Sequence, residues 1–226
     1  TSAMITSLRS TRILALVAVA LAGFATLSLP ASAATPEELI RPIQDQWAEI
    51  KYRQPEKQHA ESYRMLASQA RRVVEANPKL PEPLIWEGIV LSSEAGAAGG
   101  LGGLSLAKEA RQRLDEALKI DDKALGGSAY ASLATLYAKV PGWPVGFGDN
   151  ERAEEYFRKA LAINPDGIDP NYFYGEYLSE RGRQAEAVAH LEKALKAPAR
   201  PGRELADSGR RQEVQTLLAK VKKDQR

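Results

Sequence analysis

Few residues in this chain have the type and spacing that enzyme chemistry requires. The sequence contains no cysteine and two histidines, His59 and His190. The lack of thiols excludes thiol catalysis and cysteine-ligated metal sites, and neither histidine belongs to a His-Glu-x-x-His motif. His190 falls on the polar side of a helical pattern, so we expect it to be exposed. Because no Gly-x-Ser-x-Gly nucleophile elbow is found either, we predict a protein that is not an enzyme and uses no cofactor or metal.

The aromatic side chains are better candidates for a binding site. Trp86, Tyr130 and Tyr174 have helical spacing, which is typical of core residues. Trp143 and Phe147 instead lie in a loop rich in proline and glycine, 140–149. Two interpretations remain open: these rings fold under the edge of the protein, or they present an aromatic surface to a ligand. We take all five as candidate contacts for a partner or ligand, with Trp143 as the strongest anchor.

A helical motif that recurs along the chain must position these residues. It consists of a small residue, a large apolar residue four positions later, and Ala-Leu three and four positions after that. Copies occur at 110–121, 153–165 and 187–198, with a weaker one at 66–78. On a helix these positions share one face. We therefore expect Ala117, Ala160 and Ala194 to be buried small residues where two helices meet.

The spacing of the copies indicates the kind of repeat. Ala160 and Ala194 are 34 residues apart, which is the tetratricopeptide (TPR) period. Partner helices are predicted at about 82–94, 128–139 and 170–180. The turns at 95–103 and 140–149 should be expanded and should lie on one edge, where function tends to collect. The predicted fold is an all-α, right-handed solenoid, with a helical lead-in at 34–58, repeats at 59–198 and a capping helix within 199–226.

The N-terminus has the pattern of an export signal. Arg9 and Arg12 precede an uncharged apolar run, and Ala31-Ser-Ala33 forms a small-x-small cleavage site. Cleavage there predicts a periplasmic protein with no membrane span in the mature chain; a retained membrane anchor is the open alternative. Residues 34–226 carry 29 basic and 29 acidic side chains, so nucleic acid is not an expected partner. A cluster of arginines near the C-terminus is expected to be solvated surface; its members are Arg200, Arg203, Arg210 and Arg211.

Three stretches within about 60–200 carry a family resemblance. Tyr174-Gly-Glu-Tyr177 resembles the first helix of a TPR unit. The turn at 141–148 leads directly into the copy at 153, and the Gly-rich turn at 96–103 matches it. Together they resemble a bacterial periplasmic TPR protein. More narrowly, the chain is similar to the TatT-like family, which is associated with TRAP (tripartite ATP-independent periplasmic) transporters. Many members of that family are lipoproteins, whereas this chain lacks the cysteine that a lipid anchor requires.

The resemblance implies a helical solenoid that binds a transporter's solute-binding protein and has a pore for an apolar ligand. We accordingly predict a non-catalytic periplasmic adaptor that binds a protein partner through its groove or loop edge. The alternative is an accessory component of a TRAP-type uptake system that binds a small apolar or anionic solute.

Overall fold

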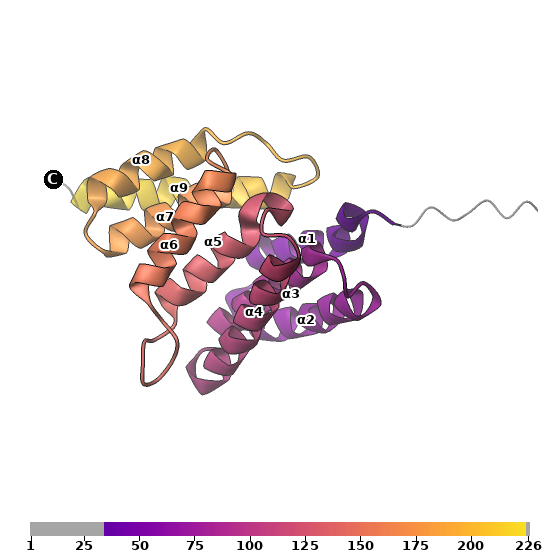
Figure 1. Cartoon of the computed structure of the whole chain (residues 1–226). Helices are drawn as coiled ribbons and strands as arrows, with labels where there is room; N and C mark the ends of the chain where they lie inside the picture. Colours follow the sequence, from indigo (N-terminus) through magenta and orange to yellow (C-terminus); the bar gives the residue numbers. More distant parts are fainter. Residues whose placement is uncertain (1–33, 225–226) are drawn as a thin grey trace, which may run out of the picture. The chain divides into compact units, whose positions relative to one another are not determined.

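The computed structural model describes residues 34–224, and these residues are all helical apart from their turns. The helices are α1 (Pro36–Arg53), α2 (His59–Ala76), α3 (Pro81–Ala98), α4 (Gly100–Ile120), α5 (Ala124–Lys139), α6 (Asn150–Ile163), α7 (Ile168–Glu180), α8 (Gln184–Leu195) and α9 (Glu204–Asp224), with a 3₁₀ turn at Glu56–Gln58. Successive helices form antiparallel pairs, α3 with α4, α5 with α6 and α7 with α8 (Figure 1). The chain is therefore an all-α stack of helix pairs, as predicted.

The recurring motif forms the second helix of each pair. Its alanines Ala117, Ala160 and Ala194 have no exposed surface, which confirms the predicted register. The large residue of each copy is equally buried, as Phe157 shows at 1% exposure. Small and large residues alternate on this face, so the partner helix can approach closely while the larger side chains fill the remaining space.

Glycine on the first helix of two pairs makes that approach possible. A Cβ atom on Gly88 of α3 would lie 2.7 Å from Cγ of Leu114, and one on Gly175 of α7 would lie 2.8 Å from Cγ of Leu191. Both leucines are the large residues of their motif copies. The two pairs therefore share one packing device, in which the leucine of the second helix sits on a glycine of the first.

The glycine-rich run at 95–103 is not the expanded turn that we predicted. Helix α3 continues to Ala98 and α4 begins at Gly100, so a single residue, Gly99, separates them. Gly99 and Gly100 reverse the chain with φ angles of +63° and +56°, which only glycine adopts freely. Gly103 lies so close to α3 that a Cβ atom there would be 2.6 Å from the carbonyl oxygen of Ala95. The insertion lengthens both helices because glycine lets them remain in contact up to the turn.

The other predicted helix boundaries are close to those observed. Residues 125–127 of α5 have left-handed backbone, so the regular helix begins near Ser128 as expected. The capping helix predicted at 204–223 is α9. The predicted lead-in at 34–58 contains α1, which packs against α2 as the first helix of one more pair. The predicted export segment at 1–33 lies outside the described residues. None of the helices within 34–224 is long and apolar enough to cross a membrane.

The arginine cluster near the C-terminus is not solvated surface. Only 7% of the Arg210 side chain is exposed, and its Nε is 2.9 Å from Oδ1 of Asp169. Arg200 reaches the other oxygen of Asp169 at 2.7 Å and bonds Asp207 through Nη2 at 2.6 Å. These arginines join the start of α7 to α9, so the expectation of a free basic surface was wrong. Hydrophobic periodicity cannot reveal such a network, because its partners are far apart in the sequence.

Helix α9 also closes the stack against its first helix. The Arg41 guanidinium of α1 donates to the carbonyl oxygen of Gly202 at 3.0 Å. At the other end of α1, Lys51 pairs with Glu213 of α9 at 3.2 Å. The first helices and α9 therefore surround a common interior, and the functional candidates are placed relative to that interior.

Candidate binding site

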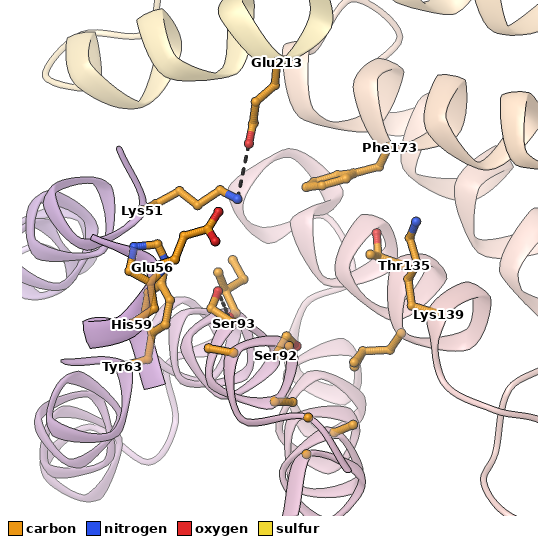
Figure 2. A pocket seen from close by; sticks show the side chains of 18 of the residues that line it. Lys51, Glu56, His59, Tyr63, Ser92, Ser93, Thr135, Lys139, Phe173 and Glu213 are labelled. Atoms are coloured by element: carbon orange, nitrogen blue, oxygen red, sulfur yellow. Dashed lines mark hydrogen bonds and ion pairs between the residues drawn. The ribbon is translucent and has the colours of Figure 1, made fainter. Parts of the chain in front are cut away.

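Residues of α1, α3, α5, α7 and α9 surround an open cavity of about 1990 Å³, which we call the bowl (Figure 2). Its walls come from residues 47–54, 89–97, 132–140, 172–176 and 209–220, together with the turns at 55–59 and 99–107. The same helices also contribute to the closed core, with Ile43, Leu84 and Ile168 at most 4% exposed.

Two ion pairs face each other across the bowl. Lys51 pairs with Glu213 on the side of α1 and α9. Lys139 of α5 pairs with Glu176 of α7 at 3.1 Å and also with Glu180. Burial alone would lower the pKa of Lys139, but hydrogen bonds and charge from these two glutamates raise it instead. Lys51 and Lys139 are therefore each paired with a carboxylate. The bowl is also lined by four further cationic side chains and one further glutamate, which are Arg53, Lys57, Arg210, Lys220 and Glu56.

Hydroxyl groups of α3 and α5 also line the bowl. The Ser92 hydroxyl donates to the carbonyl oxygen of Gly88 at 2.7 Å, and the Thr135 hydroxyl donates to that of Ala131 at 3.0 Å. Ser93 accepts a bond of 2.9 Å from the indole nitrogen of Trp47. Because the Ser92 and Thr135 protons are used within their own helices, the oxygens of both residues offer lone pairs to the bowl.

The wall beside the turns is uncharged. It contains Leu101 and Leu104 from the first turns of α4 and Val140 and Val145 from the loop after α5. This loop and the α3–α4 turn are in contact, since a Cβ atom on Gly146 would lie 3.2 Å from Cδ1 of Leu104. The two segments, 99–104 and 140–149, therefore lie side by side as expected; we call them the turn edge.

The loop at 140–149 has a well-defined backbone, with one aromatic ring turned inward and one outward. The amide of Gly148 donates to the carbonyl of Pro141, and that of Asp149 to the carbonyl of Tyr137, both at 2.9 Å. Phe147 packs edge-on against Tyr137 at 5.4 Å and lies under the Arg111 guanidinium at 4.4 Å. Trp143 is 90% exposed. Phe147 is therefore folded under the edge, whereas Trp143 is exposed, and its contact with a ligand stays a prediction.

The other three candidate contacts lie away from the turn edge. Trp86 is buried in the core against Trp47, with ring centroids 6.1 Å apart. Tyr174 is also buried, where it packs on Phe157 at 5.3 Å. Tyr130 is partly exposed beside Tyr156 and is not among the residues that line the bowl. Helical spacing correctly marks Trp86 and Tyr174 as core residues, so their geometry gives them a packing role.

Neither histidine has a surrounding that suggests catalysis. His190 is half-buried rather than exposed: its Nδ1 lies 2.9 Å from Oδ1 of Asn171 and its ring meets Tyr174 edge-on at 4.8 Å. Burial lowers the pKa of His190. His59 lines the bowl, and its Nε2 bonds the carbonyl oxygen of Gln54 at 3.0 Å. Within residues 34–224, no group of three His, Asp or Glu side chains is placed to hold a metal ion.

The polar residues of the bowl were not identified from sequence. Lys51, Lys139 and Glu213 look like ordinary charges on amphipathic helices, and only the fold shows that they face one another. The one local indication is Ser92-Ser93, a polar pair within the apolar stretch of α3. Such a pair on a first helix is compatible with a wall that faces a cavity, but it does not reveal the opposite wall.

A family model supports the repeat assignment for one part of the chain. A tetratricopeptide repeat model matches residues 146–166. That stretch covers the end of the loop and all of α6, the clearest copy of the motif. A crystal structure of a thermophilic TPR protein from Thermus thermophilus aligns with 83% of this chain and 98% of that chain, at 16% identity and a TM-score of 0.43. Among curated proteins, no sequence matches the chain.

Proposed function

We propose that this protein is a non-catalytic adaptor that binds a protein partner at its turn edge. The tetratricopeptide match at 146–166 supports a scaffold role, because stacked helical repeats commonly serve as binding surfaces for other proteins. The observation that carries the proposal is the position of Trp143. A large aromatic side chain that is 90% exposed on a structured loop is suited to insert into a pocket of a partner.

The apolar residues around Trp143 strengthen this assignment. Within the described residues, five large hydrophobic side chains are exposed, and three of them, Leu101, Trp143 and Val145, belong to the turn edge. Exposed apolar side chains gathered in one region mark interaction sites more often than single ones do. Because the loop backbone is already held by hydrogen bonds, docking would order few additional groups, which lowers the entropic cost of binding.

The proposal places the adaptor in the periplasm. Its support is the sequence pattern of residues 1–33, with Arg9 and Arg12 before an apolar run and a small-x-small site at Ala31–Ala33. The resemblance of the 141–148 turn to TatT-like proteins suggests the solute-binding protein of a TRAP transporter as the partner. That solute-binding protein would then contact the turn edge.

A second candidate function is favoured by the bowl. An accessory component of a TRAP-type uptake system would bind a solute itself, and a concave site with polar groups in its walls is suited to a small molecule. The two surfaces adjoin, because Leu101 and Val145 of the turn edge also line the bowl, whereas Trp143 does not.

The adaptor proposal is tested by comparing three forms of the protein as bait in periplasmic extract. Wild type, Trp143→Ala and Met65→Ala are immobilised at equal density. Met65 is a matched control, since it is a 54% exposed apolar residue outside the turn edge. We expect one protein to be retained by wild type and Met65→Ala but lost with Trp143→Ala. Equal retention by all three forms would remove the turn edge from the binding site.

A further inference from the structure

The charged residues of the bowl are unevenly distributed among its walls. Five of the six cationic side chains that line it, and two of the three glutamates, come from α1, α9 and the 3₁₀ turn between α1 and α2. We call this part of the lining the charged side. Figure 2 shows Lys51 and Glu56 on that side of the bowl and Lys139 on the other. A ligand that spans the bowl therefore meets two chemically different surfaces.

The charged side has more cations than its carboxylates neutralise. Three of its cations are held by carboxylates, which are Glu49 for Arg53, Glu213 for Lys51, and both Asp169 and Glu213 for Arg210. Lys57 and Lys220 are exposed and pair with no carboxylate of residues 34–224. Glu56 is also exposed and pairs with no cation of those residues. Two unpaired cations and one unpaired carboxylate leave an excess of one positive charge, which attracts a monoanion.

The uncharged wall on the other side offers an apolar contact. Leu101 is 84% exposed and Val145 is 59% exposed, although both line the bowl beside Leu104 and Val140. Covering such side chains with an apolar ligand removes their surface from water, which favours binding. The lysine next to this wall, Lys139, is held by two glutamates, so it leaves no uncompensated cation there.

The hydroxyl groups of the bowl do not oppose an apolar ligand. Ser92, Ser93 and Thr135 each donate their proton to a carbonyl oxygen of their own helix, at 2.7–3.0 Å. An apolar chain that covers these three hydroxyls therefore leaves no donor without a partner. The ring of Phe173 is partly exposed and points into the same space (Figure 2), so it adds to the apolar contact.

We infer that the bowl binds a long-chain carboxylate, with the headgroup near Lys57 and Lys220 on the charged side and the acyl chain along the uncharged wall and Phe173. A carboxylate carries the single negative charge that the charged side lacks. The bowl volume of about 1990 Å³ exceeds that of the usual ligand pocket, roughly 300–1,000 Å³, so a long chain has room. The inference rests on the second candidate function, to which it gives a ligand class. It does not require Trp143, so it is independent of the adaptor proposal.

Calorimetry on the purified chain tests the ligand class with three probes, each below its micelle concentration. Decanoate and octanoate differ by two methylene groups, and decyltrimethylammonium has a chain of the same length as decanoate with a cationic headgroup. Each buried methylene group strengthens binding about fourfold, so decanoate should bind about fifteenfold more tightly than octanoate. Decyltrimethylammonium should bind at least tenfold more weakly than decanoate.

The other outcomes overturn the inference in distinguishable ways. Equal affinity for decanoate and octanoate would show that the chain does not contact the uncharged wall. If decyltrimethylammonium binds as tightly as decanoate, or alone, the bowl is still a solute site but does not select a carboxylate. No binding of any probe at millimolar concentration would contradict the inference and would also count against the second candidate function.

A pair of double variants then locates the headgroup. Lys57→Gln/Lys220→Gln removes the two unpaired cations of the charged side, so we expect decanoate affinity to fall about tenfold. Lys79→Gln/Lys123→Gln removes the same charge from two exposed lysines outside the bowl and should bind decanoate like wild type. The melting temperature of each variant is measured in parallel to confirm folding. Equal decanoate affinity in the two folded double variants would contradict binding of the headgroup in the bowl.

Discussion

The carboxylate of Asp169, whose side chain is 31% exposed, makes a contribution to stability whose size and pH dependence can be derived. Burial alone would raise its pKa, but the guanidinium groups of Arg210 and Arg200 outweigh burial and hold the pKa at about 2, below the ordinary value of 3.8. A shift of nearly two units corresponds to about 2 kcal/mol of folding free energy at neutral pH. We therefore expect Asp169→Asn to lower the free energy of unfolding by about 2–3 kcal/mol at pH 7, because it also leaves Arg210 short of one partner.

The sign of the pH dependence follows from the direction of that shift. Because the folded pKa lies below the unfolded one, the stabilisation is fully present above about pH 4 and is lost as the pH falls towards 2. The difference in the free energy of unfolding between wild type and Asp169→Asn should thus be the same at pH 7 and pH 5 and should be smaller at pH 3. Urea unfolding followed by circular dichroism measures it at each pH.

A neighbouring aspartate provides the control. The Asp166 side chain is 74% exposed and pairs with Lys193 at 3.2 Å, so Asp166→Asn should change stability by less than about 0.5 kcal/mol. If Asp169→Asn is no more destabilising than Asp166→Asn at pH 7, or if its effect is the same at pH 7 and pH 3, the assignment of the arginine network as a stabilising element is wrong.

Three further results are expected. Ala160→Leu should lower the free energy of unfolding, measured in urea, by roughly 1–3 kcal/mol, because a fully buried alanine leaves no room for a larger side chain. If the variant is as stable as wild type, the predicted repeat register is wrong. Gly175→Val should lower the free energy of unfolding by about 2 kcal/mol or more, since even a Cβ atom there would lie 2.8 Å from Cγ of Leu191. If this variant is as stable as wild type, the packing of α7 on α8 does not require glycine at this position. N-terminal sequencing of protein from the periplasmic fraction should give Ala34 as the first residue, whereas full-length protein in washed membranes would support a retained anchor.

The sequence was most informative where packing is local and periodic. The motif around Ala160 placed α6 correctly, because the same face of a helix must be buried in every copy. The same reasoning failed at 95–103, where the glycines were interpreted as an expanded turn. Glycine at position 103 allows α3 and α4 to contact each other closely. That contact depends on both helices and cannot be inferred from the glycine-rich run alone. A count of glycines therefore cannot distinguish a long loop from a close helical hairpin.

The candidate site was predicted only in part, for a related reason. Trp143 was identified because it stands outside any helical period in a loop rich in proline and glycine. Lys51, Lys139 and Glu213 were not, because each is an ordinary charge on its own helix and becomes a neighbour of the others only when α9 returns to α1. Arg210 was assigned to the surface for the same reason, since its partner Asp169 lies 41 residues earlier in the chain.

The most direct test of the adaptor proposal is cross-linking in intact cells. A photoreactive amino acid replaces Val145, which is 59% exposed on the turn edge, so Trp143 itself stays intact; a second form carries it at Met65. The account predicts one defined adduct from position 145, none from position 65, and loss of the adduct when Trp143→Ala is added. Because Trp143 is 90% exposed, that substitution should change the free energy of unfolding by less than about 0.5 kcal/mol. An adduct from position 65 alone, or one from position 145 that persists without Trp143, would contradict the proposed binding surface.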